Sequence, residues 1–185
     1  MLKIVGVTGS VSSPSRTRSV VEATLARVGD APDVEQTLLD IAELLPWLAI
    51  RCRDEAAPPV IRALDAIEKA DLLIVGTPVY KGSYTGMLKH LIDLLNYPAL
   101  LKTPVGLIAV GGSDRHALVI EHELRPLFGF FGAKTLPTGI FLSDKTIEGG
   151  RIIDEAANAR LDHLVSEAVH ELDLVRLRKA KATTS

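Results

Sequence analysis

Short runs of apolar, often β-branched residues alternate along the chain with longer segments in which apolar positions recur every three or four residues. Runs of the first kind are typical of strands buried on both faces, and segments of the second kind are typical of helices that cover a sheet. The alternation therefore predicts βαβ units around a parallel sheet. The predicted strands cover Leu2–Thr8, Val34–Leu39, Leu72–Gly76, Val105–Val110 and Lys134–Phe141.

The periodic segments between and after these strands predict the helices. Strict alternation of strands and helices is typical of an α/β protein with a doubly wound sheet, which carries helices on both faces. The predicted helices cover Thr17–Arg27, Val60–Lys69, Gly86–Asn96, His116–Phe131 and Asp154–Lys179.

The remaining segments lack a clear period. Ile41–Pro59 is predicted to be loop with about one helical turn, and Ser143–Ile153, which contains Gly149-Gly150, is predicted to be a turn or a small hairpin. Residues 179–185 are small and polar, and we expect this tail to fray. Residues 1–178 are then expected to form a single domain, because 185 residues are too few for two large ones.

The composition narrows the class of protein. Apolar residues make up 47% of the chain, charged residues make up 24%, and the mean hydropathy is +0.23, which together exclude a wholly disordered protein. With 21 Lys and Arg against 23 Asp and Glu, the net charge of −2 gives no basic field for a nucleic-acid partner.

The cysteine content and the apolar runs bear on the compartment. A single cysteine, Cys52, excludes an internal disulfide and a multi-cysteine metal site, and a free thiol is typical of a reducing compartment. The apolar runs have the length of strands, far below the ~18 residues of a membrane span, and the N-terminus lacks a secretory cleavage site. We therefore expect a cytoplasmic protein with no membrane partner.

Candidate chemistry gathers in the loops after the first, third and fourth predicted strands. In an open parallel sheet, ligands bind beyond the carboxyl ends of the strands, where the strand order reverses. The first loop holds five hydroxyl side chains from Ser10 to Thr17, together with Arg16 and Arg18. Hydroxyls, free N–H groups at a helix start and a guanidinium group are the donors that a phosphate dianion needs. A serine-capped turn with solvated arginines is the alternative.

The second loop, Thr77–Gly86, combines Tyr80, Lys81 and Tyr84 with two glycines. These residues can offer a flat wall and a close backbone approach to a planar ring, although a structural proline turn with surface tyrosines would read the same way. The third loop, Gly111-Gly112-Ser113, again places glycines and a hydroxyl before a helix. Together the three loops predict one pocket.

Several competing motifs are absent from the sequence. No G-x-G-x-x-G follows the first strand, and neither a P-loop nor a G-x-S-x-G nucleophile motif occurs. The five histidines form no H-E-x-x-H motif, and their spacing does not bring three ligands together. We therefore expect no metal site.

Three strings of residues resemble those of a known family. They are Gly9-Ser10 through Pro14-Ser15-Arg16, Gly76 with the T-P-x-Y-x-x-x-x-x-G-x-L-K block Thr77–Lys89, and Gly111-Gly112-Ser113 with Leu124-Arg125-Pro126. The strings are similar to the NAD(P)H-dependent FMN reductases of the flavodoxin-like superfamily. They resemble above all the branch that supplies reduced flavin to alkanesulfonate- and methanesulfonate-type two-component monooxygenases. The resemblance covers residues 1–172 and implies a flavodoxin-like fold with five parallel strands in the order 2-1-3-4-5.

The resemblance also implies which residues contact FMN. Ser10, Ser15, Arg16 and Thr17 would hold its phosphate, with Arg18 as a further cation nearby. No catalytic side chain is implied, because NADPH or NADH would pass a hydride to flavin N5 while the protein positions the rings and stabilises the developing charge with backbone N–H groups. The residues that would border the flavin, in part through the backbone of Tyr80 and Lys81, are Pro78, Val79, Tyr80, Lys81, Tyr84, Gly111, Gly112 and Ser113.

A mean hydropathy that is high for a monomer of 185 residues, together with the apolar content of one helix, predicts a homo-oligomer, either a dimer or, as the resemblance suggests, a dimer of dimers with the helix that carries His122 also at the contacts. Several members of the alkanesulfonate branch have an inserted tyrosine in the fourth helix where this chain has His122, as the methanesulfonate-linked reductases do. The resemblance implies that a residue here tunes the passage of flavin across an oligomer contact. The helix Gly86–Asn96 also has more apolar residues than one face against a sheet requires. They are Met87, Leu88, Leu91, Ile92, Leu94 and Leu95.

We expect FMN to bind loosely and to leave in reduced form, for use by a flavin-dependent monooxygenase. Three alternatives remain open at this point. A quinone or azo reductase of the same fold would hold FMN tightly, and a flavodoxin-type electron carrier would not turn over pyridine nucleotides and would tend to be strongly acidic. A receiver domain, which is not an enzyme, would need an acidic metal cluster where this chain has Gly9-Ser10.

Overall fold

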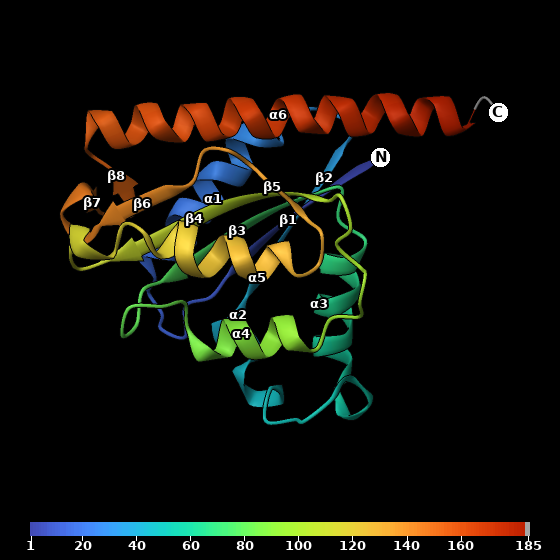
Figure 1. Cartoon of the computed structure of the whole chain (residues 1–185), viewed down its shortest axis with the longest axis horizontal. Coiled ribbons are helices and arrows are strands. Elements are labelled where there is room, and N and C mark those ends of the chain that lie inside the picture. The colour runs from blue at the N-terminus through green and yellow to red at the C-terminus, as the bar shows by residue number, and fades with distance from the viewer. Residues whose placement is uncertain (184–185) are drawn as a thin grey trace.

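The computed structural model describes residues 1–183, and a parallel sheet with helices on both faces lies at its centre (Figure 1). The predicted α/β class and the strand order 2-1-3-4-5 are confirmed. Because the chain turns one way after the first strand and the other way after the third, space opens between the loops that follow them. In spatial order the strands are β2 (Val34–Asp40), β1 (Leu2–Thr8), β3 (Leu72–Pro78), β4 (Pro104–Gly111) and, on the same edge of β4, β5 (Lys134–Thr135) and β6 (Ile140–Ser143).

The two faces of the sheet have separate hydrophobic cores. One face, here called the α1/α6 face, is covered by α1 (Arg16–Val28) and α6 (Glu155–Thr183) (Figure 1). The other, called the α3/α4/α5 face, is covered by α3 (Pro58–Glu68), α4 (Gly86–Asp93) and α5 (Arg125–Gly129).

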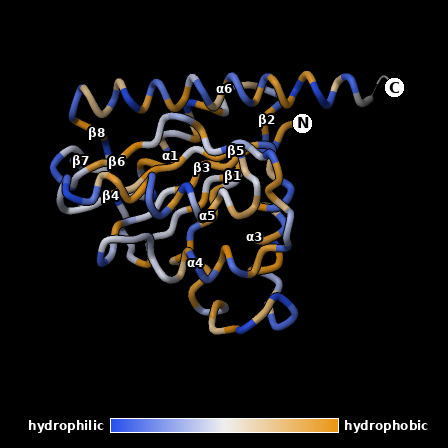
Figure 2. Tube along the Cα trace, viewed as in Figure 1, coloured by the Kyte–Doolittle hydropathy of each residue, from blue (hydrophilic) through white to orange (hydrophobic). Residues whose placement is uncertain are grey.

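Residues of the central strands alternate between these two cores, as the pleat of a strand requires. In β3, Leu72 and Ile74 join the α1/α6 core, whereas Leu73 and Val75 join the other core. Figure 2 shows the complementary pattern in α6, where hydrophobic and hydrophilic residues alternate along the length of the helix. Such a pattern is expected of a helix with one side on a sheet and the other in water.

The last predicted strand is wrong as a continuous element. Instead of one strand over Lys134–Phe141, the chain pairs with β4 as β5, leaves the ladder, and returns as β6. Pro137 has no N–H to donate to a ladder, which explains the break. The carbonyls freed there are bound by Arg125, whose Nη1 donates to Leu136 O and whose Nη2 donates to Pro137 O, both at 2.6 Å.

The helix predicted over His116–Phe131 is also wrong as a single regular element. A 3₁₀ turn, Asp114–His116, is followed by a π-helical turn, Ile120–Leu124, before α5 begins. In the π-helical turn the N–H of Arg125 donates to the carbonyl of Ile120, five residues earlier. One extra residue is therefore accommodated at His122, and such turns occur frequently at functional sites.

Two further boundaries differ from those predicted. The helix expected over Gly86–Asn96 ends at Asp93, because Leu94 and Leu95 close the end with shorter-range bonds to Leu91 and Ile92. The segment expected to be mostly loop, Ile41–Pro59, contains α2 (Ile41–Leu44) and two 3₁₀ turns, Leu45–Trp47 and Arg53–Glu55.

The hairpin predicted within Ser143–Ile153 is confirmed as β7 (Ile147–Glu148) and β8 (Arg151–Ile152). The tail expected to fray begins at residue 179, and α6 continues to Thr183 where the structure describes the tail. Lys179 contributes to this order, with its Nζ 2.7 Å from Asp71 Oδ2. Residues 184 and 185 lie outside the described part of the chain. None of the helices in residues 1–183 is long and apolar enough to cross a membrane.

Candidate functional site

The loop after β1 forms a compact turn that leads into α1. Ser10 is buried, and its Oγ accepts the N–H of Ser12 at 3.2 Å and donates to the Ser12 carbonyl at 3.3 Å. Ser15 is the N-cap of α1, because its hydroxyl accepts the N–H of Arg18 at 3.2 Å. The N–H groups of Arg16 and Thr17, in the first turn of the helix, are left for a ligand as at any helix start.

The loop after β3 is bound to the loop after β1. Thr85, which is buried and caps α4, donates its hydroxyl to the carbonyl of Gly9 at 2.6 Å. The N–H of Thr85 donates in turn to Thr77 Oγ1 at 3.3 Å. The first contact fixes the spacing between the two loops, and the second holds Thr85 in place within its own loop.

Within the second loop, residues 80–83 form a tight turn. The N–H of Tyr80 donates to Ser83 O at 2.9 Å and the N–H of Ser83 donates back to Tyr80 O at 3.2 Å. Lys81 and Gly82 both have positive φ, 53° and 86°, as a two-residue hairpin turn of this type requires. Because the N–H groups of Tyr80 and Ser83 are used inside the turn, those of Lys81 and Gly82 at its tip are the backbone donors that the turn leaves for a ligand.

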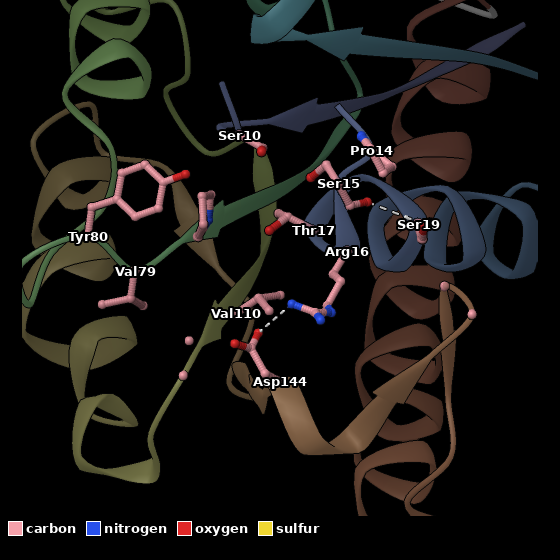
Figure 3. A pocket seen from close by; sticks show the side chains of 15 residues that line it. Ser10, Pro14, Ser15, Arg16, Thr17, Ser19, Val79, Tyr80, Val110 and Asp144 are labelled. Carbon is pink, nitrogen blue, oxygen red and sulfur yellow. Dashed lines mark hydrogen bonds and ion pairs between the residues drawn. The ribbon is translucent and has the colours of Figure 1, made fainter. Parts of the chain in front are cut away.

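A cavity of about 630 Å³ lies between these loops, and nine of the predicted site residues line it (Figure 3). They come from three separate stretches of chain, as the arrangement of loops at the end of a parallel sheet predicts. They are Ser10, Ser15, Arg16, Thr17, Pro78, Val79, Tyr80, Gly111 and Gly112.

Arg18 is not among the residues that line the cavity. Its guanidinium group contacts Asp40 and Glu43, both at 2.6 Å, and Glu22 at 2.9 Å. The hydrogen bond that Arg18 donates to Glu43, followed by those to Glu22 and Asp40, raises the pKa of Arg18 above its ordinary value. With three carboxylates around it, this arginine adds little positive potential to the loop Ser10–Thr17, called here the phosphate loop.

The remaining predicted residues also lie outside the cavity lining. The hydroxyl of Ser113 caps the 3₁₀ turn that follows it by accepting the N–H of Arg115 at 3.4 Å, and the Lys81 side chain is exposed at the turn tip. Tyr84 lines a second hollow of about 570 Å³ between α4 and α5, called here the α4/α5 groove. His122 and Phe130 line the same groove.

The surplus apolar stripe predicted on the helix Gly86–Asn96 is wrong. Leu88, Leu91, Ile92, Leu94 and Leu95 are all buried within the chain itself, and Met87 is half-buried. The exposed large apolar side chains near this helix lie elsewhere, at Tyr97, Leu101, Leu118 and Phe130. The rings of Tyr97 and Phe130 are in contact, with centroids 5.6 Å apart.

Sequence reasoning missed the wall opposite the phosphate loop. Asp144, which directly follows β6, and Gly149-Gly150, at the tip of the hairpin, line the cavity. Asp144 Oδ1 lies 3.2 Å from Arg16 Nη1, so the cavity is bridged by an ion pair (Figure 3). The glycine pair predicted the hairpin, but nothing local in the sequence places that hairpin against α1.

The lining of the cavity fits a ligand with a phosphate at one end and a planar ring at the other. Hydroxyls, a helix start and Arg16 lie at the first loop, while Pro78, Val79 and Tyr80 form a wall at the second loop. At Gly112, an added Cβ would meet only Asp144 Oδ2, at 3.7 Å, so a ligand can approach the backbone there closely. The residues present therefore fit FMN.

Comparison with known proteins agrees with this arrangement. The family model described as NADPH-dependent FMN reductase matches residues 2–148. The chain belongs to this family of oxidoreductases. An FMN reductase (NADPH) of Pseudomonas aeruginosa is 44% identical over 160 residues, which is 86% of each chain. The NADH-dependent FMN reductase SfnE of Pseudomonas putida is 44% identical over 169 residues, or 91% of each chain.

Solved structures give the same result at the level of the fold. The apo form of an NADH:FMN oxidoreductase, EMOB, superposes with a TM-score of 0.75 at 31% identity and covers 96% of this chain and 90% of that one. A WrbA-like flavodoxin of Agrobacterium tumefaciens, at 16% identity, superposes with a TM-score of 0.61 over 95% of this chain and 97% of that one. The second likeness shows the flavodoxin-like fold alone.

Proposed function

We propose that the protein oxidises NADPH or NADH and reduces FMN, which binds in the main cavity as a substrate and leaves in reduced form. The observation that carries the proposal is the meeting of two chemistries in one cavity. Phosphate donors lie at Ser10, Ser15, Arg16 and Thr17, and a wall for a planar ring lies at Pro78–Tyr80. The family match supports the same reaction.

In this proposal the protein acts by position and electrostatics. FMN supplies N5, the atom that accepts the hydride from the nicotinamide. The wall Pro78–Tyr80 orients the ring, and the N–H of Lys81 stabilises negative charge that develops on its edge. The hydrogen bond from Thr85 to Gly9 holds the ring wall at a fixed distance from the phosphate loop.

The charges around the cavity favour release of the flavin. Among the cavity-lining residues of the described chain, Arg16 is the one cation and Asp144 the one carboxylate. Their side chains are 57% and 48% exposed, so water competes for both. A phosphate held largely by hydroxyls and backbone N–H groups can dissociate, which suits a substrate better than a fixed cofactor.

Steady-state oxidation of NADPH and NADH over a range of FMN concentrations tests this function. Relatives of equal identity are named for different nucleotides, so both must be assayed. Saturation with added FMN, and little activity without it, is the expected result. Protein that is purified yellow and reduces a quinone fully without added FMN would instead be a quinone reductase.

We further propose that the protein forms a homo-oligomer through the α4/α5 groove, with a second copy as the occupant. Tyr97 and Phe130 are 68% and 70% exposed beside this groove, and such aromatic side chains are typical of interface centres. Within residues 1–183, the ring of Phe130 packs against Tyr97 and against Phe131, which leaves the outer sides of the two exposed rings open to a second copy. Light scattering that gave the mass of one chain at micromolar concentration would contradict the assembly.

His122 is proposed to act on flavin passage from this groove. It lines the groove and also a small hollow that reaches Gly82, in the turn beside the flavin wall. Ser83 Oγ donates to Glu123 Oε2 at 2.9 Å and so joins that turn to the π-helical turn. His122→Ala should change the rate of FMN exchange by less than about tenfold without lowering the melting temperature. His163→Ala, an exposed histidine on α6, is the matched control.

Reduced FMN that leaves the protein needs an acceptor. We propose a flavin-dependent monooxygenase of the sulfonate type as the partner and the cytoplasm as the compartment, where the exposed thiol of Cys52 would remain reduced. A coupled assay in which a monooxygenase of this type converts its sulfonate only when this protein, FMN and NAD(P)H are present tests the partner.

A further inference from the structure

The Arg16–Asp144 ion pair places a carboxylate against the residue expected to hold the phosphate of FMN. We propose that Asp144 is a specificity-determining residue that weakens binding of phosphate-bearing flavins and so speeds their release. The proposal rests on the function proposed above. It assigns a role to a residue that lies 128 positions from its partner and outside the motifs of the loops.

Asp144 reaches the cavity because of its place in the sheet. Ser143, the last residue of β6, pairs with Gly111 at the end of β4. Asp144 therefore follows its strand at the same edge of the sheet as the three loops. Its Oδ1 contacts Arg16 Nη1 at 3.2 Å, and its Oδ2 faces the third loop, 3.7 Å from where a Cβ on Gly112 would lie. In Figure 3, Arg16 extends from the start of α1 toward Asp144.

The backbone around Asp144 is held in place. Thr146 Oγ1 donates to the carbonyl of Ser143 at 2.8 Å, and the N–H of Ile153 donates to the carbonyl of Thr146 at 2.9 Å. At the hairpin tip, Gly150 approaches α1 so closely that a Cβ would lie 3.0 Å from Ser19 Oγ. Because the hairpin rests on α1, the carboxylate of Asp144 stays near the phosphate loop when a ligand enters.

A phosphate dianion in this loop would compete with Asp144 for the same guanidinium group. Arg16 makes a single contact to the carboxylate and has further N–H donors, so it can turn to a phosphate. The carboxylate then loses its partner, or shares it, and repels the dianion. Arg18 cannot offset this repulsion, because three carboxylates already surround its guanidinium group.

The decisive variant is Asp144→Asn, which keeps the size of the side chain and removes its charge. Dissociation constants for FMN and for riboflavin, which lacks the phosphate, are measured by quenching of flavin fluorescence. We expect FMN to bind about three- to tenfold more tightly to the variant and riboflavin to bind unchanged. Stopped-flow release of FMN should slow by a similar factor. Glu148→Gln, which removes the same charge from β7 of the same hairpin, should change neither constant.

Other results would overturn the proposal. If Asp144 only ties the hairpin to α1, Asp144→Asn lowers the melting temperature and weakens FMN binding. If Asp144 binds the ribityl chain of the flavin, the variant should bind riboflavin more weakly as well. If the variant merely opens the cavity, it should bind FMN and riboflavin more tightly by the same factor. Asp144→Ser provides a second uncharged variant should the first fold poorly.

The same measurements separate this inference from the proposed function. Wild-type protein that neither binds FMN nor oxidises NAD(P)H with it refutes the function. Wild-type protein that does both, with an Asp144→Asn variant whose FMN affinity is unchanged, refutes only the role of Asp144. In an Arg16→Ala background, Asp144→Asn should still tighten FMN, because the repulsion remains when the competition is gone.

Discussion

The two faces of the sheet are alike inside and different outside. Each has a continuous apolar core that includes alternate residues of the same strands. On the α1/α6 face, two long regular helices are joined to each other and to the ends of the sheet by ion pairs, such as Arg27–Asp162 at 2.8 Å and Arg176–Asp33 at 2.8 Å. The α3/α4/α5 face is built from short helices, 3₁₀ turns and a π-helical turn, with a groove and exposed aromatic rings.

The difference divides two tasks between the faces. The phosphate loop begins α1, so the anchoring end of the cavity belongs to the more cross-linked face. The turn Tyr80–Ser83, which is proposed to border the flavin, is joined through Ser83 and Glu123 to the π-helical turn on the other face. Under the proposed function, one face would hold the ligand, while the other would provide the surface at which contacts change.

Truncation of one buried leucine on each face should have the largest effect on stability, and the two costs should differ because the α1/α6 face is the more rigid. Leu164 in α6 and Leu124 in the π-helical turn are both fully buried. Leu164→Ala should cost about 3–5 kcal/mol of unfolding free energy, and Leu124→Ala about 2–3 kcal/mol, since side chains around the groove can relax into the space. Chemical denaturation measures both values. Equal costs would contradict the idea that the α3/α4/α5 face is the more adaptable one.

Arg16→Ala should weaken FMN binding about ten- to hundredfold, because a charge-assisted contact worth about 1.5–3 kcal/mol is lost. The variant also leaves Asp144 without its partner beside the phosphate. Fluorescence titration should show a much smaller effect on riboflavin. Arg27→Ala, farther along α1, is the control and should leave both affinities unchanged. Equal weakening of the two flavins would show that Arg16 does not anchor the phosphate.

A carboxylate introduced on the α3/α4/α5 face should disrupt the oligomer, whereas one introduced on the α1/α6 face should not. Phe130→Asp should shift the oligomer toward monomer at micromolar concentration, since a carboxylate would be buried against a second copy. Leu177→Asp, at an apolar position of α6 that is 58% exposed, should leave the mass unchanged. Light scattering of both variants gives the result. Loss of the oligomer in Leu177→Asp alone would move the interface to the α1/α6 face.

The smallest predicted effect is the loss, in acid, of the ion pair between α6 and the start of β2. The hydrogen bond from Arg176 lowers the pKa of Asp33 below its ordinary value of 3.8. A lowered folded-state pKa means that the stabilisation is present above the unfolded pKa and is lost as pH falls through the folded value. The melting temperatures of wild type and Arg176→Ala should differ slightly at pH 6 and should begin to converge as the pH falls below about 4. A difference that does not diminish as the pH falls below about 4 would contradict the assignment.

Much of the fold could be predicted because its central elements are determined locally. β1, β3 and β4 are apolar on both faces, and the serine cap of α1 lies directly before the helix that it starts. The break between β5 and β6 has a local signal in Pro137, but the carbonyls that it frees are bound by Arg125, 11 and 12 residues away. A periodicity argument cannot detect such a contact.

The candidate site likewise has a part that local motifs predict and a part that depends on contacts between distant residues. The loop motifs predicted nine of the residues that line the cavity, all from the three loops after β1, β3 and β4. They did not predict that Arg18 turns to Asp40 and Glu43, 22 and 25 residues away, nor that Asp144 faces Arg16. A charged side chain takes the partner that the folded chain offers, and that choice depends on the packing of distant elements.

The double role of Thr85 has a consequence for energetic linkage. Its hydroxyl caps α4, on one side of the groove, and also donates to Gly9 at the end of β1. A displacement of the first turn of α4 therefore changes the geometry at the entrance to the phosphate loop. If a neighbour in the groove shifts α4, flavin affinity changes with it, and thermodynamic reciprocity requires that flavin change the affinity for that neighbour by the same factor.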